Sequence, residues 1–141
     1  MPSLDTNILI RYLVQDDPKQ NREANAFIAQ YANTNASLFH PSTVILETAW
    51  VLRSVYKFSK ESIIDLFTSL LEAREISFQD EASVERAVYL FRDHHVDFAD
   101  CFHVATAYTF NHLPLVTFDK KAVRAEEIEA IPDDIKSPPN V

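Results

Sequence analysis

The stretch Ser3-Leu4-Asp5-Thr6-Asn7 places a carboxylate, a hydroxyl and an amide where a short apolar opening meets a helical pattern over Ile8–Val14. We interpret this opening as a strand that ends at Asp5. In open α/β sheets, ligands bind beyond the carboxyl ends of the strands, so an acid at such an end faces a crevice. The competing interpretation is that Asp5 or Thr6 only N-caps the following helix, which is common for these residue types.

The stretch Leu113-Pro114-Leu115-Val116-Thr117-Phe118-Asp119 repeats this construction far down the chain, because it predicts a short strand with an acid at its carboxyl end. The repetition favours a functional role for both Asp5 and Asp119. The densest basic group of the chain follows directly and consists of Lys120, Lys121 and Arg124. Such a group predicts either a solvated helix face or a contact with substrate phosphates.

The alternation of strands and helices predicts the fold class. Further strands are expected at residues 37–41 and 75–78, and either a short last strand or an ordered tail is expected from residue 131 onward. Helix starts are expected at Asp17, Ser59 and Asp80. This order predicts an α/β fold with a central parallel sheet of four to five strands, flanked by helices on both faces.

The composition fits one globular domain over residues 1–141, with 47% hydrophobic residues. The single cysteine, Cys101, excludes an internal disulfide and a multi-cysteine zinc site, and it agrees with a reducing compartment. The sequence has no apolar run long enough to cross a membrane and no signal-peptide pattern at its start. We therefore expect a cytoplasmic protein without a membrane partner.

The absence of glycine excludes the glycine-rich phosphate loops and the nucleophile elbow of serine hydrolases. A net charge of −8 argues against nonspecific adhesion to nucleic acid. It does not exclude an enzyme that acts on phosphates, because an acidic cluster that holds divalent cations presents those cations to the substrate.

The helix expected over residues 43–56 is apolar around nearly its whole circumference, which predicts burial on most sides. We expect its exposed remainder to bind another protein. Glu47 lies in the middle of this surface, where an ionised side chain needs a metal, a hydrogen-bonding partner or water. The alternative is a narrow wet strip near the helix start, where the macrodipole favours acids.

Asp97 and Asp100 stand three positions apart at the start of a further helix. Asp97 resembles an N-cap residue, with Asp100 answering it as in a capping box. Asp100 is the better functional candidate because it lies inside the first helical turn. No histidine is assigned a role, and His103 is expected to be an ordinary helix residue.

Four acids, Asp5, Glu47, Asp100 and Asp119, come from two strand ends and two early helix positions, which a doubly wound sheet can bring to one edge. Carboxylates confined together repel and raise one another's pKa unless a cation neutralises them. Their hard oxygen ligands suit Mg²⁺ or Mn²⁺, which activate water and stabilise the leaving oxygen in phosphodiester hydrolysis.

Taken together, four motifs resemble a PIN domain, specifically the VapC-type toxins of type II toxin–antitoxin systems. The motifs are Leu4-Asp5-Thr6-Asn7, the helix Val44–Leu52, Asp97-Phe98-Ala99-Asp100 and Thr117-Phe118-Asp119. The resemblance covers almost the whole chain, and the four motifs occur in the right order at compatible spacing. The sequence departs from the family pattern at Lys57 and at His94-His95, in loops where members of the family frequently have glycine.

The resemblance implies an Mg²⁺-dependent endoribonuclease, in which Mn²⁺ can substitute, that forms a homodimer and is held inactive by a cognate antitoxin. By motif match, Asp5, Glu47, Asp100 and Asp119 are the metal-binding acids. Asp97 is an auxiliary acid, and Asn7 and Thr117 are polar supports.

Two other classes are weighed against this interpretation. A receiver-like phosphoacceptor module also gathers acids around Mg²⁺, but the second and third expected strands end in His40-Pro41 and Phe78-Gln79, without an acceptor acid. A catalytically silent PIN-like protein-binding module is disfavoured by the complete acid set.

Overall fold

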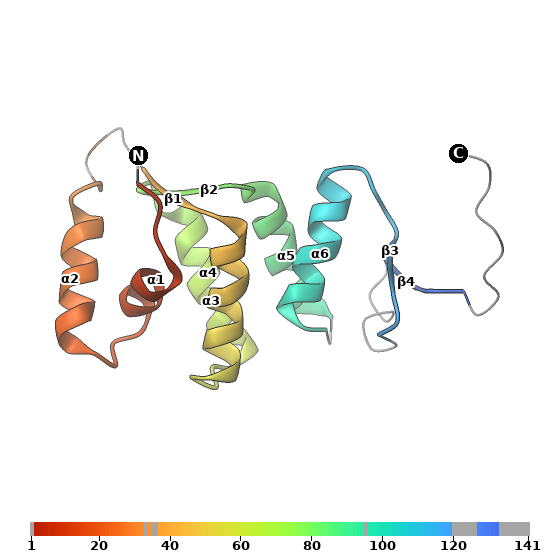
Figure 1. Cartoon of the computed structure of the whole chain (residues 1–141), viewed down its shortest axis with the longest axis horizontal. Coiled ribbons are helices and arrows are strands. Elements are labelled where there is room, and N and C mark those ends of the chain that lie inside the picture. The colour runs from red at the N-terminus through yellow and green to blue at the C-terminus, as the bar shows by residue number, and fades with distance from the viewer. Residues whose placement is uncertain (1, 33, 35–36, 95, 120–126, 133–141) are drawn as a thin grey trace.

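A computed structural model describes residues 2–32, 34, 37–94, 96–119 and 127–132. Helices and short strands alternate along these residues (Figure 1). The elements are α1 (Thr6–Leu13), α2 (Pro18–Ala29), β1 (Leu38–His40), α3 (Ser42–Ser54), α4 (Lys60–Glu72), β2 (Ile76–Phe78), α5 (Glu81–Asp93), α6 (Phe98–Thr109), β3 (Leu115–Thr117) and β4 (Ile128–Ala130). No helix in these ranges is long and apolar enough to span a membrane.

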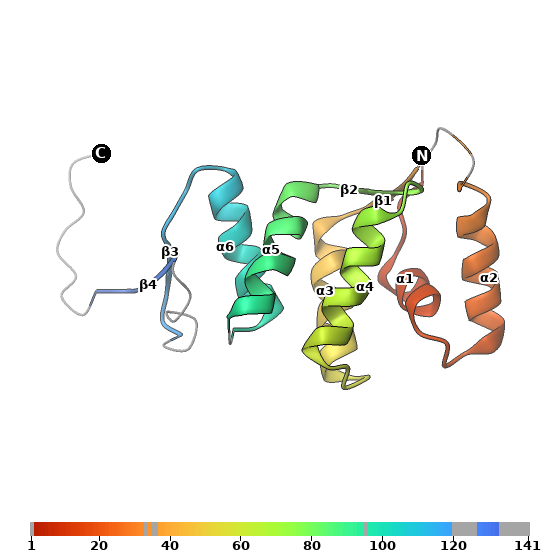
Figure 2. The same ribbon diagram turned by 180° about the vertical axis from the view of Figure 1, so that it is seen from behind.

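The strands form two parallel pairs, β1 with β2 and β3 with β4. The expected opening strand is reduced to one parallel bridge between Ser3 and Phe39, in which the Leu4 N–H donates to the Phe39 carbonyl at 3.0 Å. Figures 1 and 2 show β3 and β4 at one end of the molecule, beyond α5 and α6. The α/β class with parallel strands is therefore confirmed, whereas the described residues do not form the expected single sheet of four to five strands, because helices separate the two pairs.

The helix starts follow from local side-chain chemistry. Asp17, Ser59 and Asp80 each accept a hydrogen bond from a backbone N–H three residues ahead, which satisfies one of the orphan donors of the first turn. The expected starts of α2, α4 and α5 are confirmed.

The largest hydrophobic core lies mainly among α3, α4, α5 and α6. At its centre the Phe98 ring stacks on Phe67 with centroids 5.0 Å apart, and the Phe91 ring meets Phe98 edge-on at 5.6 Å. This packing fixes the start of α6, because Phe98 is its first residue. On α3 the core takes only one side, since Trp50 remains exposed, as does Val55 directly after the helix.

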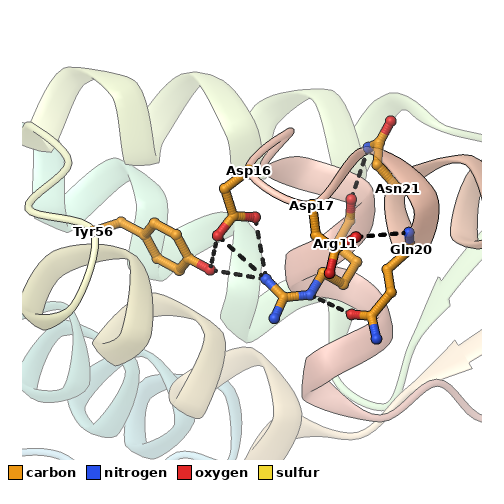
Figure 3. A network of polar contacts seen from close by, with 6 residues as sticks. All are labelled: Arg11, Asp16, Asp17, Gln20, Asn21 and Tyr56. Atoms are coloured by element: carbon orange, nitrogen blue, oxygen red, sulfur yellow. Dashed lines mark hydrogen bonds and ion pairs between the residues drawn. The ribbon is translucent and has the colours of Figure 1, made fainter.

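A polar network joins the loop after α1 to the end of α3 (Figure 3). The Arg11 guanidinium donates to Asp16 Oδ1 and to the Tyr56 hydroxyl, both at 3.1 Å. The Tyr56 hydroxyl in turn donates to Asp16 Oδ2 at 2.8 Å. Tyr56 and Arg11 together stabilise the ionised Asp16, so this acid has a structural partner of opposite charge.

Candidate active site

Asp100 lies in the first turn of α6 and is half-buried. Burial raises the pKa of its carboxyl above the ordinary value of 3.8, and the nearby charges of Asp119 and Asp97 raise it further. All three effects disfavour the ionised form. The structure therefore places three acids, from the start of α6 and the end of β3, within electrostatic reach of one another.

Asp97 is the N-cap residue of α6, yet its side chain makes no capping hydrogen bond. The carboxylate is exposed and lines a cavity beside α3. The capping-box alternative is therefore not realised at this helix. The Asp97 carboxylate is available for another role at the edge of the acidic group.

Asp119 follows β3 after one residue, and its backbone N–H donates to Thr117 Oγ1 at 3.0 Å. Thr117 is the last residue of β3. This local bond fixes the turn that carries the Asp119 side chain. The polar supporting role that the resemblance implies for Thr117 stays a prediction.

Asp5 occupies a different environment. It is the N-cap of α1, it is exposed, and its Oδ1 accepts a hydrogen bond from the Thr6 N–H at 2.8 Å. Asn7, also exposed, lines a cavity between α1 and α2. In Figures 1 and 2, α3 lies between α1, which Asp5 caps, and β3, the strand that precedes Asp119.

Glu47 lies on α3 and is exposed, as the wet-strip alternative anticipates. It shares a helix face with Trp50, three positions further on. The basic residues Lys120, Lys121 and Arg124 lie outside the described residues. The roles predicted for these four side chains stay predictions.

Two neighbours of Asp100 refine the chemistry of the group. His103, for which the sequence predicts no role, is exposed, and its charge lowers the pKa of Asp100. The signal for it was the spacing of three between an acid and a histidine on one helix. Burial raises the pKa of the Cys101 thiol to about 12, so Cys101 stays protonated and is no nucleophile.

The acids fit a hard divalent cation in their donor chemistry. Mg²⁺ is commonly held by one or two carboxylates, with water and substrate phosphate oxygens completing its shell. Asp100 and Asp119 supply such carboxylates, and their mutual repulsion is what a cation relieves. In the part of the chain that the structure describes, there is no group of three or more His, Cys, Asp and Glu side chains that could hold a metal ion.

Comparison with known proteins supports the family that the four motifs indicate. The sequence profile of the PIN domain matches residues 3–128. The chain belongs to the PIN domain family. A VapC ribonuclease of Aquifex aeolicus (strain VF5) is 23% identical over 121 residues, which cover 86% of this chain and 89% of that protein. The resemblance found in the four motifs is thereby confirmed for the PIN domain.

Proposed function

We propose that this PIN domain protein is an Mg²⁺-dependent endoribonuclease that acts as the toxin of a type II toxin–antitoxin pair. The observation that carries the proposal is the acidic group of Asp97, Asp100 and Asp119, in which the pKa of Asp100 is raised by burial and by its two neighbours. Perturbed carboxyls of this kind concentrate at functional sites. The similarity to a VapC ribonuclease supports the choice of RNA as the substrate.

Asp100 and Asp119 are the side chains that would hold Mg²⁺, or Mn²⁺ in its place, with Asp97 as the auxiliary acid. The bound ion supplies an activated water and stabilises the leaving oxygen. Half-burial of Asp100 limits solvent screening at that position, which strengthens its attraction for a cation. Thr117 holds the turn that orients Asp119. Asp5 and Glu47 are proposed as further metal-binding acids on the motif match alone.

The deciding experiment measures cleavage of a long single-stranded or looped RNA by the purified protein. We expect cleavage in Mg²⁺ or Mn²⁺ and none in EDTA, with activity restored when Mn²⁺ is returned in excess. Activity that survives exhaustive chelation would show that the metal mechanism is wrong.

Isothermal titration with Mn²⁺ separates the enzyme from a silent PIN-like binding module. We expect the wild type to bind Mn²⁺ and the Asp5→Asn and Asp100→Asn variants to bind it more weakly. The control is Asp16→Asn, which removes an acid outside the group. Mn²⁺ binding without RNA cleavage under any condition would favour the silent module.

The proposed partners are a cognate antitoxin and a second copy of the chain. A cavity of about 440 Å³ between α1 and α2 is lined by the exposed apolar side chains of Ile8 and Phe27. Exposed apolar patches mark protein-binding surfaces, so this cavity is our proposed antitoxin site. Light scattering tests the homodimer, and copurification with the protein encoded beside it tests the antitoxin. We also propose that the protein acts in the cytoplasm.

The sheet formed by β1 and β2 argues against the receiver-like alternative. These two strands end at His40 and Phe78, so neither presents an acid at its last position. His40 is fully buried, its Nδ1 lies 3.0 Å from the Leu38 carbonyl, and burial lowers its pKa. A neutral, buried histidine does not replace an acceptor carboxylate.

A further inference from the structure

A cavity of about 430 Å³ opens between α3, the start of α4 and the start of α6. Its walls include Trp50, Arg53, Lys60, Phe91 and Asp97. The volume falls within the range of about 300–1,000 Å³ that is usual for small-ligand sites. The proposed metal-binding acids do not line it, apart from the auxiliary Asp97.

The wall formed by α3 combines an aromatic ring with a fixed cation. Trp50 is the only tryptophan of the chain, and 63% of its surface is exposed. Arg53 is exposed, and its guanidinium donates to the Phe58 carbonyl at 3.0 Å, which uses one of its five N–H donors. The cavity therefore presents a flat indole beside a positive charge that is held at a defined place.

Lys60, at the start of α4, gives the cavity wall a second positive charge. Lys60 Nζ donates to the His94 carbonyl at 2.7 Å and lies 5.0 Å from the centre of the Phe91 ring. These contacts hold the lysine against the cavity wall. The cavity therefore has two positively charged side chains, although the chain as a whole has a net charge of −8.

The cavity adjoins the acidic group. Asp97 lines the cavity, and its charge also raises the pKa of Asp100. Glu47 lies one helical turn before Trp50 on the same face of α3. A polymer whose backbone crosses the acidic group can therefore place an adjacent unit in the cavity.

We propose that this cavity is a nucleobase-binding subsite, in which a base next to the scissile phosphate stacks on Trp50 while Arg53 contacts the neighbouring phosphate. The inference rests on the proposed ribonuclease function and deepens it, because it requires a single-stranded substrate whose bases are unstacked. Aromatic side chains stack on bases without sequence preference, since every base has a π face, and an arginine adds charge complementarity to the phosphate.

A nucleobase fits the walls better than a second copy of the chain does. The centre of a protein–protein interface is depleted in charged residues, whereas Arg53, Lys60 and Asp97 all border this cavity. Charged walls around one exposed indole match a nucleotide, which has both an aromatic and an anionic part.

The test uses the fluorescence of the single tryptophan. Metal-free protein in EDTA is titrated with a single-stranded oligoribonucleotide, and binding is followed in parallel by the anisotropy of a 5′-labelled copy. We expect saturable quenching of Trp50 emission with the same Kd as the anisotropy gives. Trp50→Ala is expected to weaken RNA binding about tenfold, while Trp50→Phe retains most of it. Arg53→Gln is expected to weaken binding and to reduce its salt dependence.

The matched control is Tyr89→Ala, which removes an aromatic ring of similar exposure on α5, away from this cavity. It is expected to leave the Kd unchanged. In Mg²⁺, Trp50→Ala should raise KM more than it lowers kcat, because it removes binding at a neighbouring unit and not a group at the reacting phosphate. Circular dichroism and light scattering on each variant report folding and oligomeric state.

The outcomes separate this inference from the proposed function. If the wild type cleaves RNA while Trp50→Ala and Trp50→Phe both keep the wild-type Kd and KM, the subsite is overturned and the ribonuclease stands. If the wild type neither binds nor cleaves RNA, both are overturned. If Trp50→Ala converts a dimer to a monomer at unchanged RNA affinity, the indole serves a subunit contact and the subsite is overturned.

Discussion

Asp16 and Asp100 are two carboxylates whose surroundings shift the pKa in opposite directions. The hydrogen bond from Tyr56 lowers the pKa of Asp16, and the charge of Arg11 lowers it further. Burial raises the pKa of Asp100, and Asp119 and Asp97 add to this. One acid has a hydroxyl and a cation as partners, whereas the other has two more acids.

The difference distinguishes Asp16, which stabilises the fold, from Asp100, whose negative charge needs a bound cation to be stabilised. Around Asp16, protein groups already satisfy the negative charge, and Figure 3 shows them arranged between the loop after α1 and the end of α3. Around Asp100, the ionised form is costly until a cation arrives.

The largest expected effect is on catalysis at Asp100. Asp100→Asn keeps the size of the side chain but removes the charge that a hard cation needs, so RNA cleavage should fall about 100-fold or more. Asp16→Asn should change cleavage by about twofold at most, because its surface ion pair lies outside the acidic group. The measurement is the initial rate of RNA cleavage in Mg²⁺ by variants shown to be folded. Equal losses in both variants would break the comparison.

The secondary structure was predictable because its signals are local. Proline after His40 stops β1, and side-chain caps at Ser59 and Asp80 start α4 and α5 where expected. The PIN resemblance was equally accessible, since each motif keeps its acid in a short run of sequence. The placement of Asp119 near Asp100 was also predictable, because Asp119 lies at the end of an expected strand and Asp100 lies at the start of an expected helix.

The arrangement of the elements was less predictable, because it depends on contacts between distant segments. Sequence could not show that α5 and α6 separate the two strand pairs, or that the opening strand shrinks to a bridge at Ser3. The apolar pattern predicted that the helix over residues 43–56 is buried on most sides, yet Trp50 and Val55 are exposed. The side of an apolar helix that meets its neighbours follows from packing and not from composition.

Asp97→Asn sharpens the ranking within the acidic group. Asparagine caps a helix about as well as aspartate, and the Asp97 side chain makes no capping bond here, so the fold should be unaffected. Because Asp97 is an auxiliary acid, the substitution should lower the rate of RNA cleavage about tenfold or less. It should also lower the Mn²⁺ affinity less than Asp100→Asn does. If Asp97→Asn is inactive and Asp100→Asn is active, the third metal-binding acid has been assigned to the wrong residue of the pair.

Thr117→Val tests a support of the group with a smaller expected effect. Valine keeps the shape of the side chain but removes the acceptor of the Asp119 N–H, whose bond is 3.0 Å long. A hydrogen bond of this kind contributes about 0.5–1.5 kcal/mol, so cleavage should fall about two- to tenfold. Thr117→Ser, which keeps the acceptor, is the matched control and should retain the wild-type rate. A wild-type rate in Thr117→Val would remove this residue from the site.

The smallest expected effect is on stability, and its sign differs between the two acids. Asp16, whose folded pKa is lowered, contributes stability that is present above its ordinary pKa and is lost as pH falls through its folded value. Asp100, whose folded pKa is raised, costs stability above its folded value, and this cost disappears below its ordinary pKa of 3.8. In metal-free protein at pH 7, Asp16→Asn should therefore lower Tm slightly and Asp100→Asn should raise it.

Both Tm differences should shrink toward zero as the pH falls below the ordinary carboxyl range, because the wild-type acids then lose their charges. Adding Mg²⁺ should raise the Tm of the wild type and of Asp16→Asn by a similar amount, since a ligand that binds the folded state stabilises it. It should raise the Tm of Asp100→Asn much less, so the advantage of that variant should vanish in Mg²⁺. A lower Tm for metal-free Asp100→Asn at pH 7 would mean that Asp100 has a stabilising partner, and the contrast with Asp16 would fail.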